Sequence, residues 1–180
     1  MARANGSADL ILHPVRMRII RSLLGGRRLT TAELAADLPD VATATLYRHV
    51  GTLADAGVLE VVSERQVRGA TERTYELRTD AAQVDADALA AMRPEEHRQA
   101  FAAFTAGLLA SFDAYVDRGD VDLEADRVGY RHRALWLTDA ELDEFLGELG
   151  RLAARWGELG PGAGRRRRVL STVLIPDEDA

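Results

Sequence analysis

The sequence contains no cysteine, which excludes disulfide bonds, thiolate metal sites and a thiol redox switch. It also lacks any apolar run long enough for a signal peptide or a membrane span. We therefore expect a cytoplasmic protein that makes no contact with a membrane. The four histidines are scattered and do not have the spacing of a zinc site, so we expect no metal and no other cofactor.

Recognisable catalytic patterns are missing as well. The sequence has no Ser/His/Asp order, no phosphate-binding glycine loop and no paired carboxylates beyond ordinary surface acids. We therefore expect that the protein is not an enzyme.

Lysine is absent, so all 23 basic residues are arginines, and their distribution is uneven. Residues 1–79 carry 11 arginines against 9 acidic residues, a net charge of +2, whereas residues 80–180 carry 12 against 20, a net charge of −8. The overall isoelectric point near 5.3 argues against a protein coated in nucleic acid. It still permits a local basic face on the N-terminal part.

Hydrophobic spacing and capping residues predict three short helices and then a β-hairpin in the N-terminal part. The helices are expected to begin at Pro14, at the Thr30–Glu33 capping box and at Ala42. Gly57 is expected to end the third helix. Strands are expected over 58–63 and 72–77, with a polar turn between them.

The third expected helix, 42–56, has an unusual outer face. Its apolar stripe is Leu46, Val50 and Leu53, and the opposite side carries small residues, threonines, Tyr47 and Arg48. A helix-turn-helix protein uses such a face to read DNA. Taken alone, Arg48 fits a solvated surface position better than a DNA contact, and it is the full order of elements that favours DNA contact. We expect the following DNA-binding residues: Thr43, Ala44, Thr45, Tyr47 and Arg48 on the helix, and Arg65, Gln66, Arg68 and Arg73 on the hairpin.

Residues from about 10 to 78 resemble the winged helix-turn-helix of ArsR-type bacterial transcriptional regulators. The stretches that carry this resemblance are "HPVRMRIIRSLL", "LTTAELAADL", "ATLYRHVGTLADAGVLEVV" and "RGATERTYELR". The resemblance implies that residues 42–56 form the recognition helix and that residues 63–73 form the wing. Members of this family often sense metals through cysteine clusters, and this property does not carry over to a chain without cysteine.

The second half of the chain is expected to contain a long helix from Pro94 to about Arg118 and a helix capped by Thr138. We expect the aromatic stripe of the long helix to form a dimer interface at Phe101, Phe104, Leu108 and Phe112. Two strands, over 128–137 and 165–175, are expected to flank the second helix. Tyr130, His132 and Trp136 would lie on one side of the first strand, as in a pocket for an organic effector. A half that only dimerises fits the pattern equally well.

The predicted fold class is α+β: an N-terminal winged helix-turn-helix, a long helix and a small α/β C-terminal region. We expect a DNA-binding domain over 8–79, a linker and dimerisation helix over 80–126, and a possible effector-binding region over 127–180. Two functions remain open. The first is a homodimeric regulator that binds double-stranded DNA sequence-specifically and responds to a small organic effector. The second is a winged-helix module for protein–protein assembly without DNA binding.

Overall fold

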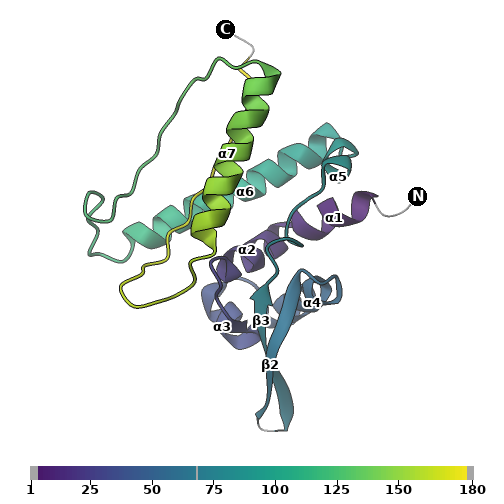
Figure 1. Cartoon of the computed structure of the whole chain (residues 1–180). Helices are drawn as coiled ribbons and strands as arrows, with labels where there is room; N and C mark the ends of the chain where they lie inside the picture. Colours follow the sequence, from purple (N-terminus) through teal and green to yellow (C-terminus); the bar gives the residue numbers. More distant parts are fainter. Residues whose placement is uncertain (1–3, 68, 178–180) are drawn as a thin grey trace.

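The computed structural model describes residues 4–67 and 69–177 of the chain (Figure 1). It combines helices with one small antiparallel sheet, which confirms the α+β class. The elements in chain order are α1 (Ala4–Ile11), α2 (Pro14–Leu23), β1 (Leu29–Thr30), α3 (Thr31–Asp37), α4 (Thr43–Asp55), β2 (Leu59–Val67), β3 (Ala70–Leu77), α5 (Ala86–Ala90), α6 (Pro94–Val116) and α7 (Asp139–Gly157).

Helices α2, α3 and α4 begin and end within two residues of the positions that the sequence indicates, whereas the sequence did not indicate α1. Pro14 occupies the first turn of α2, where its missing N–H is not needed. The Thr30 side chain accepts a hydrogen bond from the Glu33 backbone N–H, and the Glu33 carboxylate accepts one from the Thr30 N–H. After α4, Gly57 takes a φ of +75°, a conformation that costs glycine little.

The sheet has the strand order β1-β3-β2, and both pairs are antiparallel. The hairpin is longer than predicted, because β2 and β3 continue pairing as far as Val67 and Ala70. The sequence also did not indicate β1, whose two residues form a strand only by pairing with Thr74 and Tyr75 of β3. Its existence depends on tertiary contact, since two residues have no periodicity of their own.

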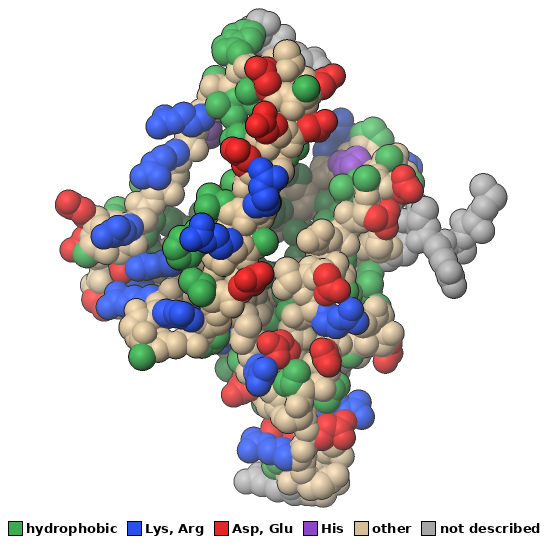
Figure 2. All heavy atoms as spheres, viewed as in Figure 1, with side chains coloured by type: hydrophobic (Ala, Val, Ile, Leu, Met, Phe, Trp, Pro, Cys, Tyr) green, Lys and Arg blue, Asp and Glu red, His purple; other side chains and the backbone are tan. Residues whose placement is uncertain are grey.

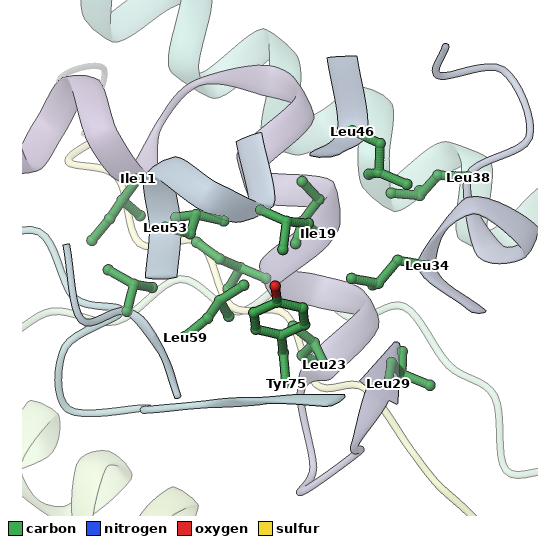
Figure 3. Close-up of a cluster of buried hydrophobic side chains, with 13 residues drawn as sticks. Ile11, Ile19, Leu23, Leu29, Leu34, Leu38, Leu46, Leu53, Leu59 and Tyr75 are labelled. Carbon is green, nitrogen blue, oxygen red and sulfur yellow. The ribbon is translucent and has the colours of Figure 1, made fainter. Parts of the chain in front are cut away.

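The hydrophobic core lies in the N-terminal unit, where side chains of α2, α3, α4 and the sheet converge (Figure 3). Ile19, Leu23, Leu34, Leu46 and Leu53 are fully buried there. The core is completed by side chains of α1 and the sheet: Ile11, Leu29, Leu59 and Tyr75. The arrangement holds α4 against α2 and α3, as in a helix-turn-helix.

The predicted strands over 128–137 and 165–175 are wrong for this structure, because both segments run as chain without a strand. The small α/β C-terminal region is therefore not formed. Each segment adjoins one end of α7, yet within the described residues no backbone hydrogen bond joins the two. A β-strand needs a neighbouring strand to satisfy its backbone groups, and neither segment has one here. The apolar stripe of α7 correspondingly has no sheet to cover it, and no residue of α6 or α7 is buried.

One contact ties the C-terminal segment to the N-terminal unit. The Arg167 guanidinium donates hydrogen bonds to the backbone carbonyls of Leu24, at 3.1 Å, and Arg21, at 2.6 Å. These carbonyls lie at the C-terminal end of α2, where a cation is favoured by the helix dipole. Arg21 in turn donates to the backbone carbonyl of Gly107 in α6. The end of α2 is therefore a junction between both halves of the chain.

Candidate nucleic-acid interface

Helix α4 has one buried side and one exposed side. Leu46, Val50 and Leu53 face the core and are buried. On the other side Thr43, Ala44 and Arg48 are exposed, Tyr47 is 58% exposed, and Thr45 is partly covered. The candidate residues on α4 thus share one outer face, with Thr45 at its edge. Among the described residues, Arg48 makes no ion pair, so its guanidinium is available to a ligand.

The first turn of α4 carries no acidic residue. The same holds for α1 and α2, whereas α3, α5, α6 and α7 each have at least one acidic residue there. The N-cap of α4, Ala42, also supplies no side chain to the free N–H groups. A helix N-terminus carries about half a positive charge and binds anions through such N–H groups. The start of α4 is therefore open to a phosphate, flanked by the threonine hydroxyls.

An ion pair holds the turn that precedes α4. Arg18 of α2 donates two hydrogen bonds to the Asp40 carboxylate, at 2.7 Å and 2.6 Å. These hydrogen bonds lower the pKa of Asp40 to about 2. Asp40 lies between α3 and α4, so the pair links the turn to α2 and helps to set the angle at which α4 leaves it.

The wing formed by β2 and β3 pairs its own charges. Arg65 makes an ion pair with Glu72, and Arg73 makes one with Glu64 at 2.8 Å. The hydrogen bond from Arg73 to Glu64 raises the pKa of Arg73. Gln66 donates to the Thr71 hydroxyl at 2.9 Å, and Arg68 lies outside the described residues. The described wing arginines are therefore already paired with neighbouring glutamates, although exposed ion pairs are weak, at about 0–1 kcal/mol.

Two histidines that are far apart in the sequence meet beneath α4. His49 is only 6% exposed, and its ring centroid lies 4.5 Å from that of His13, which precedes α2. Arg16 approaches His49, with 3.4 Å between Nη1 and Nδ1. Burial and then the nearby positive charges lower the pKa of both histidines. His49 is thus a packed residue of the helix rather than a metal ligand. Its contacts with His13 and Arg16 were not predicted from the sequence.

The candidate dimerisation residues of α6 remain accessible in the described chain. Phe101, Leu108 and Phe112 are exposed and Phe104 is half-buried. Phe101 and Phe104 stack, with their ring centroids 6.3 Å apart. The stripe thus presents an apolar surface that no other part of the described chain fully covers.

The candidate effector residues do not enclose a pocket. Tyr130 is 78% exposed and Trp136 is 80% exposed, and His132 is exposed too. Two hollows of about 540 and 440 Å³ lie elsewhere in the described part of the chain. The larger lies between the end of α2 and the end of α7, and the smaller lies between the start of α2 and α6. None of the three candidate residues lines either hollow.

Among residues 4–67 and 69–177, no group of three or more histidine and acidic side chains is placed to hold a metal ion. Within the same range, no helix is both long and apolar enough to cross a membrane.

Comparison with protein families gives one match. Residues 11–62 match the model of a helix-turn-helix domain. The matched range, less than half of the chain, contains α2, α3, α4 and the start of β2. Comparison with curated proteins found no match. The helix-turn-helix domain supports a DNA-binding regulator, and domains of this kind are typically not enzymes.

The histidine pair makes the stability of the helix-turn-helix domain dependent on pH. Because folding lowers the pKa of His49, the unfolded chain binds more protons below its ordinary value of about 6.5. We expect the free energy of unfolding to fall as the pH drops from 7.5 to 5.5, measured by urea titration at each pH. In His49→Gln this fall should be smaller. The exposed His132→Gln variant is the matched control and should behave like the wild type. Equal slopes in His49→Gln and the wild type would contradict the effect.

Proposed function

We propose that the protein is a sequence-specific, DNA-binding transcriptional regulator of the ArsR-like winged-helix type, acting as a homodimer. One observation carries the proposal: α4 of a helix-turn-helix domain has no acidic residue in its first turn, and Arg48 on its exposed face makes no ion pair with any described residue. We assign DNA reading to residues 8–79, and dimerisation and regulation to residues 80–126 and 127–180.

In the proposed complex α4 enters the major groove with its N-terminal turn leading. The free N–H groups of that turn, with Thr43 and Thr45, bind phosphate and fix the register of the helix on the duplex. Ala44 leaves room for close approach to the bases. Arg48 then donates two hydrogen bonds to a guanine edge, and Tyr47 contacts the neighbouring base. The histidine pair and the Arg18–Asp40 ion pair support this geometry from behind.

The wing contributes affinity rather than sequence discrimination. Arg65 and Arg73 sit on a projecting hairpin beside the recognition helix, which suits contact with phosphates. To contact a phosphate, Arg65 must break its ion pair with Glu72, and Arg73 must break its ion pair with Glu64. The exchange is favourable because an exposed ion pair contributes little, whereas a phosphate contact also releases counterions from DNA.

The second candidate function is a winged-helix module that assembles with another protein. The paired charges of the wing and the net charge of −6 favour it, since both weaken attraction to DNA. The two functions differ in their dependence on salt. A protein that neutralises phosphates loses duplex affinity steeply as salt rises, and an assembly module has no such affinity.

Regulation by a small organic effector is a further part of the proposal. Residues after the wing are not needed to read DNA, and Arg167 supplies a physical link from them to the end of α2. An effector that moves the segment carrying Arg167 would alter the support of α2 and therefore of α4. Tyr130, His132 and Trp136 combine aromatic surface with polar groups, the chemistry that binds small organic molecules.

We expect α4 to discriminate between sequences. The best-binding duplex is first selected from a random pool, and binding is then measured by fluorescence anisotropy on that duplex and on unrelated DNA. Arg48→Ala and Tyr47→Ala should weaken binding to the selected duplex by ~1–3 kcal/mol, the cost of a lost base contact, and weaken unrelated DNA much less. Arg98→Ala on α6 is the matched control and should bind normally. Equal losses on both duplexes would reassign both residues to phosphate contact, and no duplex binding at all would favour the assembly module.

The wing should instead act on all duplexes alike. Arg65→Ala should lower affinity for selected and unrelated DNA together, and reduce the slope of log K against log salt by roughly 1. Glu72→Gln removes the competing carboxylate from Arg65 and should raise affinity for both duplexes. If neither variant changes affinity or slope, the wing does not contact DNA.

The effector proposal predicts a ligand whose binding changes DNA affinity. Trp136 is highly exposed, so metabolite mixtures can be screened by tryptophan fluorescence together with thermal shift. A true effector should shift duplex affinity by roughly 5- to 150-fold. In Arg167→Gln the ligand should still bind, but the shift should largely disappear. The idea is lost if no metabolite binds and a chain ending before residue 127 regulates normally in cells.

A further inference from the structure

The chain exposes far more surface than a compact protein of its size. Its solvent-accessible surface is 13733 Å² for a mass of 19.7 kDa. A compact monomer of that mass exposes roughly 8,600 Å², so the excess is about 5,000 Å². An excess of this size means that a large part of the chain has not buried its own surface.

No described residue after Ala88 is buried, so the unburied part includes α6 as well as the C-terminal arm, residues 127–177. No residue of the arm is buried, and α7 has no buried position although it is amphipathic. Monomeric proteins rarely expose connected apolar patches beyond a few hundred Å². Many large hydrophobic residues of the arm are exposed: Tyr130, Leu135, Trp136, Leu137, Phe145, Leu146, Leu152, Trp156, Leu159, Val169, Leu170, Val173, Leu174 and Ile175.

The backbone of the arm is unpaired as well. Segments 129–137 and 166–175 take part in no backbone–backbone hydrogen bond among the described residues. Both segments are rich in residues that favour strands, and they are joined through α7 in the order of a β-α-β unit. The two segments do not pair with each other, so each leaves an open edge. Such edges pair readily with strands of another chain.

The charges of the arm are complementary to each other. The run Arg165–Arg168 has few acidic partners: Arg166 and Arg168 both reach the same Asp126 carboxylate, at 3.5 and 3.8 Å, as does Arg118. On α7, Asp143, Glu144 and Glu148 make no ion pair with any described residue. Figure 2 shows acidic side chains on the upper part of α7 and basic ones along the segments beside it. The basic run of one arm can therefore pair with the acidic residues on α7 of a second copy, and the acidic residues of the first can pair with the basic run of the second.

We propose that the C-terminal arm is half of an intermolecular domain, in which segments 128–137 and 165–175 form strands with those of a second copy of this chain. The two α7 stripes then cover one face of the shared sheet. A second copy supplies the same two unpaired strands and the same open helix face, so a two-fold dimer uses every unpaired element. Even half of the excess surface per chain would place the interface among obligate homodimers, at roughly 2,000–5,000 Å² or more.

This inference rests on the dimer of the proposed function and changes where that dimer forms. The stripe of α6 becomes the border of the interface rather than its centre. Arg167 lies in segment 165–175 and donates hydrogen bonds to backbone carbonyls at the end of α2. The shared sheet is therefore anchored to each DNA-reading unit. The dimer would thereby set the distance between the two recognition helices.

Two measurements on the full chain at micromolar concentration test the arm dimer: its molar mass, and the rate at which its backbone amides exchange hydrogen. Light scattering should give twice 19.7 kDa for the wild type. The amides of 129–137 and 167–175 should exchange about 100-fold or more slowly than in an unfolded chain. In Val173→Pro, which removes one ladder hydrogen bond, the dimer and this protection should be lost together. Ala163→Pro in the loop after α7 is the matched control and should remain dimeric. Protected amides in α2 and α4 would show in each variant that the N-terminal unit is folded.

Three other outcomes overturn the inference. A dimer whose 129–137 and 167–175 amides exchange freely would place the interface elsewhere, for example on α6, and would leave the proposed function intact. Protected segments in a monomer would mean that the arm folds on its own chain. A monomer with freely exchanging segments that still binds its selected duplex would reject both the arm dimer and the homodimer. Loss of duplex binding in a correctly formed arm dimer would count against the proposed function alone.

Discussion

The packing of one side of α4 against α2 and α3 is the interaction on which the rest of the structure depends. Leu46, Val50 and Leu53 bury that side completely, so α4 cannot rotate about its axis without exposing them. Tyr47 and Arg48 point outward as a geometric consequence. The capping box of α3 and the Arg18–Asp40 ion pair then fix the turn that leads into α4. The exposed face of α4 is thus specified by apolar contacts on its opposite side.

The start of α4 and the wing differ in the charged groups that they carry. The start of α4 carries no acid and no side-chain cap, whereas the wing places a glutamate beside each of its described arginines. Positive charge without an acidic partner among the described residues is therefore found on α4 rather than on the wing. The proposed DNA-binding surface is compatible with an acidic chain, because the excess of acidic residues lies in the C-terminal half. Beneath the helix, burial and the neighbouring arginines lower the pKa of both His13 and His49, which disfavours their charged form.

The two halves of the chain differ in how far they bury their side chains and pair their backbone groups. The N-terminal unit has a closed core, and every strand in it has a neighbour. The C-terminal arm has the composition of strands and an amphipathic helix, but its segments have no neighbour to pair with. Arg167 connects the two, since it bonds to the end of α2 from within the arm. Whatever orders the arm is thus mechanically linked to the helix that supports α4.

Sequence alone determined the features that depend on local chemistry. The starts of α2 and α3, the end of α4 at Gly57 and the exposed face of α4 followed from proline, capping residues and helical periodicity. The long helix from Pro94 and the Thr138 cap followed in the same way. Only the tertiary structure decided β1, the contact of His13 with His49, the ion pairs of the wing and the bond from Arg167 to α2. Each joins residues through space, and local periodicity holds no information about such partners. The two predicted C-terminal strands were wrong in the structure for the same reason: strand-forming composition can be read from one segment, whereas a strand exists only when another segment lies beside it.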